Sequence, residues 1–155
     1  MKKTILFLLM LSLIIFPTTS VSAQTSSSQT EYEYFEDGSY FVTTTEEITL
    51  SDVSVLAATN TKTGRKKSTY YNNSGEPMWF VQVTGTFSYG NGTSTCTASS
   101  VAAESSASTW KITNRSAGKS GNKATATAKQ YMLGLPINTV NRTVTLTCSS
   151  TGVLS

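Results

Sequence analysis

Carboxylates are the side chains of this sequence with the clearest catalytic potential, because the chain contains no histidine. That absence rules out Ser-His-Asp and Cys-His catalysis and histidine metal sites. Glycoside hydrolysis needs two carboxyl groups about 5 to 10 Å apart. Glu33 and Glu46 could face each other across a predicted hairpin, whereas the adjacent Glu46 and Glu47 must point to opposite faces of a strand. We therefore expect a protein that is not an enzyme, with a carboxylate-based hydrolase as an alternative.

The two cysteines, Cys96 and Cys148, each lie in a segment where small or apolar residues alternate with threonine. This pattern is typical of a half-buried β-strand, so both side chains should point inward. In an exported protein such a pair is expected to form one disulfide, and closing the loop would stabilise the fold by about 4 kcal/mol. Two cysteines without histidine cannot complete a usual zinc site, and no phosphate or calcium motif occurs, so we expect no metal and no cofactor.

Tyrosines in two short segments are the best candidates for ligand binding. Tyr32, Tyr34 and Tyr40 belong to the first predicted hairpin, and Tyr70 and Tyr71 are adjacent further along the chain. Neighbouring residues of a strand point to opposite faces, so some of these rings should be exposed. Exposed tyrosines suit sugars or peptides because each combines an apolar ring with a polar tip. Ordinary cross-strand packing is the alternative interpretation.

The first residues have the pattern of an export signal. Lys2 and Lys3 precede an apolar run over residues 5–16, and small residues then offer a cleavage site between Ala23 and Gln24. The run spans about a dozen residues, whereas a bilayer span needs about 20. We predict a signal peptide over residues 1–23, a secreted, extracellular mature protein and no membrane anchor in the mature chain.

The distribution of charge argues against a nucleic-acid partner. The formal net charge of +3 falls to +1 without Lys2 and Lys3, because 10 basic residues then face 9 acidic ones. Nucleic-acid binding needs a concentrated basic face. Acidic residues crowd the N-terminal part of the mature chain, and a basic cluster follows at residues 65–67. Acidic and basic strands are therefore expected to be neighbours or to be simply solvated. The alternative is a two-faced surface that binds a charged wall polymer.

The predicted elements that carry these residues are all strands. Residues 24–30 are a polar, flexible lead-in, and residues 31–155 should form one domain. Residues 78–89 are the clearest strand, and its predicted inward face carries Trp79, Val81, Val83, Phe87 and Tyr89. Gly85 inside this pattern suggests a bulge or a close backbone approach. Further strands are expected in a hairpin over 32–47 turned by Asp37-Gly38, and at 65–71, 93–98, 110–114, 123–133 and 140–149, with a turn at 116–122. For residues 48–60 the pattern fits either a strand or irregular chain. For residues 101–108 it fits either a loop or a helical turn.

Seven to nine antiparallel strands favour an all-β sandwich of two packed sheets. The order Cys96, Trp110, Cys148 is similar to that of immunoglobulin domains, which implies an immunoglobulin-like architecture. The chain departs from that family because Leu146 replaces its tyrosine and only seven residues follow Cys148. The chain also resembles small exported proteins of Gram-positive bacteria, in residues 69–75, 79–89 and 120–126 and in the Cys96 segment. This resemblance implies a secreted bacterial β-domain and no catalytic residue.

The combined expectation is a secreted, non-enzymatic β-sandwich that binds an extracellular surface. Its partner would be a cell-wall polymer, a glycan or an extracellular protein, and its candidate site would be the five tyrosines. A secreted antimicrobial or toxin-like effector is the first alternative, because the chain is small and carries an export signal without an anchor.

Overall fold

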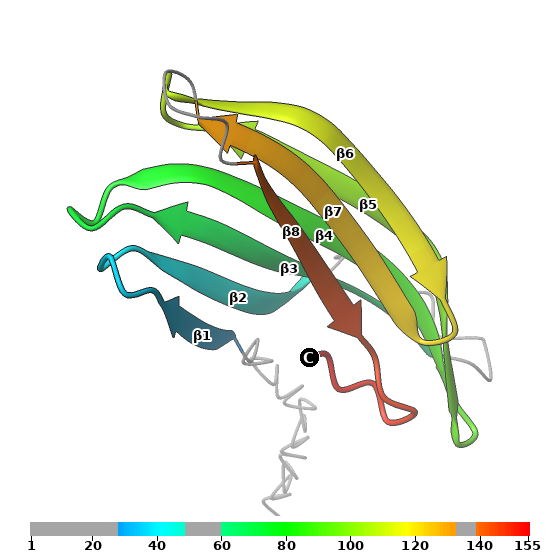
Figure 1. Cartoon of the computed structure of the whole chain (residues 1–155). Helices are drawn as coiled ribbons and strands as arrows, with labels where there is room; N and C mark the ends of the chain where they lie inside the picture. Colours follow the sequence, from blue (N-terminus) through cyan, green and yellow to red (C-terminus); the bar gives the residue numbers. More distant parts are fainter. Residues whose placement is uncertain (1–27, 49–59, 133–138) are drawn as a thin grey trace, which may run out of the picture.

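The computed structural model describes residues 28–48, 60–132 and 139–155, which form two antiparallel sheets (Figure 1). The larger sheet contains, in spatial order, β1 (Gln29–Tyr34), β2 (Tyr40–Ile48), β3 (Asn60–Tyr71), β4 (Pro77–Gly90) and β5 (Thr93–Ser105). The smaller sheet contains β6 (Trp110–Ser120), β7 (Lys123–Met132) and β8 (Thr139–Thr147). Within these ranges, no helix is long and apolar enough to cross a membrane.

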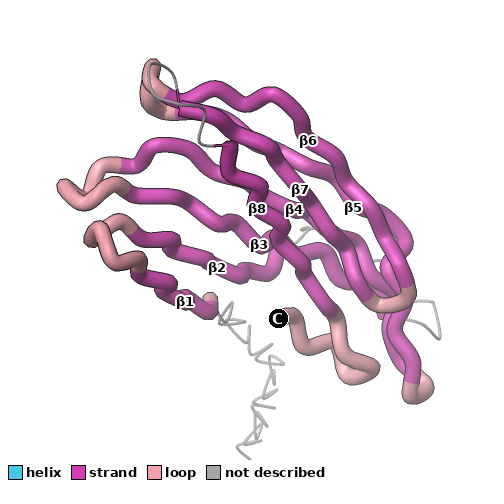
Figure 2. The backbone as a smooth tube through the Cα atoms, viewed as in Figure 1, coloured by secondary structure: helices cyan, strands magenta, loops and turns pink. Residues whose placement is uncertain are grey.

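Each sheet is a meander of consecutive strands (Figure 2). Among the strands that the structure describes, the chain passes from one sheet to the other between β5 and β6. Immunoglobulin sandwiches instead draw the strands of each sheet from separated parts of the chain. The predicted all-β fold of two antiparallel sheets is therefore confirmed, with eight strands in the described residues, and its strand order differs from the immunoglobulin one.

Several element boundaries differ from the sequence-based prediction. Residues 101–105 continue β5, where a loop or helical turn was expected, and β6 continues to Ser120, so the following turn is reduced to Gly121 and Asn122. β1 begins at Gln29, inside the predicted lead-in. These segments consist of small and polar residues, which have a weak intrinsic preference for strands. Pairing with β4 and β7 outweighs that preference, so the segments are strands nonetheless. Residues 1–27, with the predicted signal peptide, and most of 48–60 lie outside the described residues.

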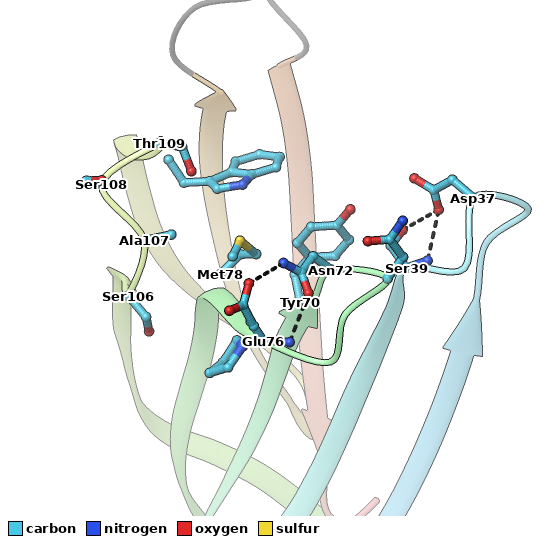
Figure 3. A pocket seen from close by; sticks show the side chains of 13 residues that line it. Asp37, Ser39, Tyr70, Asn72, Glu76, Met78, Ser106, Ala107, Ser108 and Thr109 are labelled. Carbon is cyan, nitrogen blue, oxygen red and sulfur yellow. Dashed lines mark hydrogen bonds between the residues drawn. The ribbon is translucent and has the colours of Figure 1, made fainter.

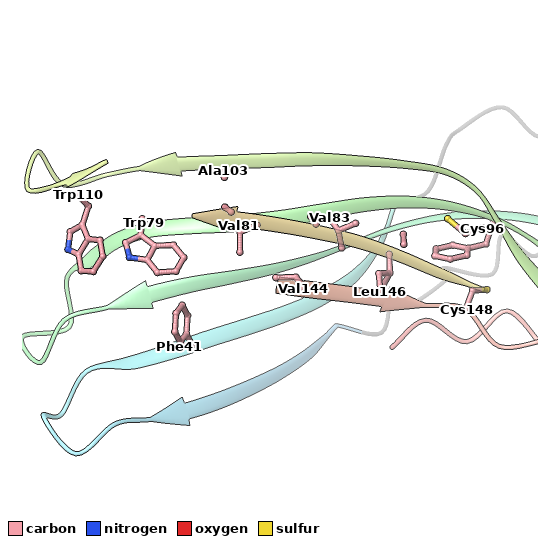
Figure 4. Packing of buried hydrophobic residues seen from close by; sticks show 14 residues of the cluster. Phe41, Trp79, Val81, Val83, Cys96, Ala103, Trp110, Val144, Leu146 and Cys148 are labelled. Atoms are coloured by element: carbon pink, nitrogen blue, oxygen red, sulfur yellow. The ribbon is translucent and has the colours of Figure 1, made fainter. Parts of the chain in front are cut away.

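The inner faces of the two sheets form one hydrophobic core (Figure 4). The predicted inward face of β4 is confirmed, since Trp79, Val81, Val83 and Phe87 are all buried. The smaller sheet packs smaller side chains against these large ones. It contributes Ala124, Ala126 and Ala128 from β7 and Val144 and Leu146 from β8, and each of these side chains is buried.

Two glycines allow the sheets to approach closely at one point of this core. Gly64 of β3 and Gly85 of β4 lie directly opposite each other in the register of the larger sheet. A Cβ atom on Gly85 would lie 2.7 Å from the Ala124 Cβ, and one on Gly64 would collide with the Leu154 side chain. The close approach predicted from Gly85 is confirmed, and the β4–β5 register also shifts next to it, between Thr86 and Phe87.

The predicted disulfide is wrong in this structure, where Cys96 and Cys148 are both free and buried. Cys96 belongs to the larger sheet and Cys148 follows the last strand of the smaller one, at the same end of the core (Figure 4). The β6–β7 turn bonds both backbones, because Cys96 N donates to Gly121 O (2.7 Å) and Cys148 N donates to Asn122 O (3.2 Å). The alternating pattern therefore placed both side chains inward correctly, but shared burial does not ensure bonding geometry.

Thiol labelling tests this assignment. Burial raises the pKa of the Cys96 thiol, so less reactive thiolate is present at pH 8 than in an exposed cysteine. We expect iodoacetamide to label the folded protein slowly and to add two groups after unfolding in urea without reductant, as measured by mass spectrometry. Unfolded protein that takes up no label would contradict the assignment of two free thiols.

Gln130 is a polar residue placed entirely within the core. Its side chain is fully buried on β7, and neither amide atom has a hydrogen-bond partner among the described residues. An unpaired buried amide costs about 1–3 kcal/mol. We expect Gln130→Met, which keeps a similar volume, to raise the free energy of unfolding by about 1 kcal/mol in urea titrations. The matched variant Gln82→Met, on the outer face of β4, should change stability little, and a loss of stability in Gln130→Met would count against this prediction.

Candidate functional site

Four of the five predicted tyrosines form a continuous row on the outer face of the larger sheet. Tyr34 lies opposite Tyr40 in the β1–β2 register, and Tyr40 lies opposite Tyr71 in the β2–β3 register. Tyr32 joins them because it shares a face with Tyr34 on β1. Successive ring centroids are 6.1 Å apart from Tyr32 to Tyr34, 5.4 Å to Tyr40 and 5.0 Å to Tyr71. We call these four residues the tyrosine row.

The outer end of the tyrosine row is open to solvent. The side chains of Tyr32 and Tyr34 are 59% and 69% exposed, while Tyr40 and Tyr71 are half-buried. The smaller sheet covers only the opposite face of the larger one (Figure 1). Neighbouring rings are nearly parallel at two steps of the row, with interplanar angles of 9° and 6°. Mutual packing restricts the rotation of the rings. Binding of a ligand would therefore cost little side-chain entropy of the protein.

Tyr70, the fifth predicted tyrosine, lies on the other face of the sheet and does not belong to the row. It packs in the aromatic part of the core, with ring centroids 5.3 Å from Phe41, 5.7 Å from Trp79 and 5.6 Å from Trp110. The strict alternation of a strand separates it from Tyr71. Both interpretations of the aromatic residues are therefore realised, since Tyr70 packs across strands and the tyrosine row is available to a ligand.

Two rigid loops hold the inner part of the row. The loop 35–39 is fastened by Asp37, whose carboxylate accepts hydrogen bonds from Ser39 Oγ (2.6 Å) and Ser39 N (3.0 Å). These bonds, the side-chain one foremost, lower the pKa of Asp37. The loop 72–76 is fastened by Asn72, which accepts from Ser74 N and Glu76 N and donates to a Glu76 carboxylate oxygen. Tyr40 and Tyr71 directly flank these loops, so both backbones are positioned by local hydrogen bonds.

Arg142 of β8 ties the row's edge strand to the opposite sheet. Its Nη1 donates to Glu33 Oε2 of β1 at 2.7 Å, and its Nε donates to the buried Ser68 Oγ at 3.1 Å. The guanidinium also lies 4.1 Å from the centre of the Phe41 ring. Every residue of β1 is exposed, so this contact supplies tertiary support that burial does not. The sequence contained no signal for it, because 109 residues separate Glu33 from Arg142.

The predicted carboxylate pair does not converge in the structure. Glu33 lies on the inner face of β1 and pairs with Arg142, whereas Glu46 lies on the outer face of β2 and pairs with Arg65. Glu47, on the inner face, pairs with Lys62 at 3.0 Å. The expectation that acidic and basic strands are neighbours is confirmed by these β2–β3 pairs. Within the described ranges, no group of three or more acidic or cysteine side chains is placed to hold a metal ion.

Comparisons with protein-family models, with curated proteins and with solved structures find no match to this chain. The candidate site therefore depends on its own geometry: a row of tyrosine rings, partly exposed, braced by two rigid loops and an intersheet ion pair.

Proposed function

We propose that this protein is a secreted, non-enzymatic β-sandwich that binds the polysaccharide of an extracellular surface through the tyrosine row. The export pattern of residues 1–23 supports secretion. The observation that carries the binding proposal is the alignment of four rings on one uncovered sheet face, with Tyr32 and Tyr34 more than half exposed.

Polysaccharide suits this surface better than a compact protein partner. The row extends across three strands, so it can contact several successive units of an extended polymer. Tyrosine contributes apolar ring surface for sugar C–H groups and a hydroxyl for sugar hydroxyls. Its neighbours on the outer face include Thr44 and Thr69, whose hydroxyl groups add hydrogen-bonding capacity without charge. A weak, repeated contact of this kind gains strength from multivalency along the polymer.

Co-sedimentation with insoluble polysaccharides tests the proposal. The protein is incubated with purified Gram-positive cell wall, chitin or cellulose, and the bound fraction is measured after centrifugation. We expect saturable binding to at least one of these and, in Tyr32→Ala/Tyr34→Ala, a loss of affinity of about 30-fold, because each ring contributes on the order of 1 kcal/mol. The double phenylalanine variant, which retains both rings, should keep most of the affinity.

Phe35→Ala provides the matched control. Phe35 is also exposed and adjacent to Tyr34, but its ring packs edge-on against Phe41, outside the row. It should bind as the wild type does. The proposal fails if the wild type sediments with none of the polymers, or if Tyr32→Ala/Tyr34→Ala binds unchanged while its circular dichroism shows a native fold.

A further inference from the structure

A concave surface lies at the end of the sandwich where three loops meet (Figure 3). It has a volume of about 770 Å³, within the range of about 300–1,000 Å³ that is usual for small-molecule sites. Loop 72–76 and Met78 form one wall, residues 106–109 form the opposite wall, and Asp37 stands at the rim. We call this surface the end depression. It differs from the tyrosine row because Tyr70, which lines it, lies on the opposite face of the larger sheet from the row.

The end depression contains two aromatic rings set at an angle. Tyr70 and Trp110 both line it, with centroids 5.6 Å apart and ring planes at 64°. Met78, half-buried, adds a polarisable thioether beside them. Aromatic side chains that line a depression can attract ammonium groups by cation–π interaction.

The charge of the lining has a single sign. Asp37 and Glu76 line the depression, and no lysine or arginine is among its described lining residues. Hydrogen bonds from Ser39 lower the pKa of Asp37, so that carboxylate is ionised at neutral pH. Glu76 is held in place by the Asn72 amide at 2.8 Å. An anionic ligand would be repelled by this rim, and a cationic one attracted.

The walls are rigid as well as complementary. Ser106 N and Ala107 N both donate to Met78 O, at 2.8 and 3.1 Å, and Trp110 N donates to Ala107 O at 3.1 Å. Ser105 Oγ donates to Ala107 O at 2.7 Å. These bonds fix the connection between β5 and β6 to the start of β4, so the site exists before a ligand arrives and binding costs little ordering.

We propose that the end depression binds an organic ammonium group, seated against Tyr70 and Trp110 with its charge facing Glu76 and Asp37. The same ammonium chemistry is carried by choline-type quaternary ammonium compounds and by protonated amino sugars. This site goes beyond the proposed polysaccharide binding and does not depend on the tyrosine row.

Ligand pairs of matched shape separate charge from size. Choline is compared with its uncharged isostere 3,3-dimethylbutan-1-ol, and glucosamine with glucose, by titration into the ¹⁵N-labelled protein. We expect choline or glucosamine to shift the amide signals of residues 106–110 saturably, with a millimolar dissociation constant, and the uncharged partner to shift them at least about fivefold more weakly. The cation that binds identifies the source. Equal binding of charged and uncharged partners, or no shift with either cation, would overturn the proposal.

Glu76→Gln and Asp37→Asn test the rim without removing the aromatic walls. Each should weaken binding of the cation about fivefold, and the amide introduced by Asp37→Asn still offers an oxygen to Ser39. Glu104→Gln is the matched control, because it removes an exposed carboxylate on the outer face of β5. Unchanged affinity in both rim variants, or an equal loss in Glu104→Gln, would show that the rim does not bind the ammonium group. Binding of choline by Tyr32→Ala/Tyr34→Ala would separate this site from the tyrosine row.

Discussion

Gly85→Val is expected to destabilise the protein by about 3 kcal/mol, although valine ordinarily favours strands over glycine. The first side-chain atom would meet the Ala124 Cβ at 2.7 Å and the Phe87 ring at 2.8 Å. Both neighbours are fully buried, and Ala124 belongs to the opposite sheet. Ala124 therefore cannot withdraw without separating the sheets, and the close-packed core leaves the Phe87 ring no free space. The loss is a large part of the about 5–15 kcal/mol that stabilises a typical domain, and urea denaturation followed by tryptophan fluorescence measures it.

Two further variants isolate the cause. Gly118→Val introduces the same residue into an exposed part of β6, where the nearest atom is the rotatable Thr125 hydroxyl at 3.1 Å, and should change stability little. Adding Ala124→Gly to Gly85→Ala should recover part of the lost stability, because it removes one of the two collisions. A stabilising or neutral Gly85→Val would mean that the sheets do not approach closely at this point.

Arg142→Met is expected to cost about 2 kcal/mol of stability and to loosen the strand that carries Tyr32 and Tyr34. The variant keeps an apolar chain but removes the bonds to Glu33 and Ser68 and the cation over Phe41. Because β1 buries none of its residues, we expect its amides to lose hydrogen-exchange protection before those of β4. A frayed β1 disorders the tyrosine row, so polysaccharide binding should weaken as well.

Arg65→Met is the control for this effect. Arg65 pairs with Glu46 on the outer face, where both side chains are about 40% exposed, and such surface pairs contribute about 0–1 kcal/mol. Arg142→Lys should be intermediate, because an ammonium retains charge but not the forked geometry. If exchange in β1 is unchanged in Arg142→Met, then the intersheet ion pair does not support the row.

Local periodicity explains which predictions from sequence succeeded. Alternation with a period of two identifies the buried face of β4, the opposite directions of Tyr70 and Tyr71, and the inward direction of both cysteines. It does not specify which strand lies beside which. Proximity in sequence groups the five tyrosines together. In the structure four of them form the tyrosine row on the outer face, whereas Tyr70 lies on the inner face and lines the end depression.

The sequence by itself determined an all-β chain, the inner and outer face of each well-patterned strand and the hairpin turn at Asp37-Gly38. These features depend on interactions between residues a few positions apart. Only the tertiary structure decided that Tyr40 lies between Tyr34 and Tyr71, that Arg142 reaches Glu33, and that three loops enclose the end depression. It also decided that the two cysteines stay apart. Each of these results depends on strand register and sheet packing. Both are set by the combined free energy of many contacts between residues distant in sequence, so the local pattern of a single segment does not predict them.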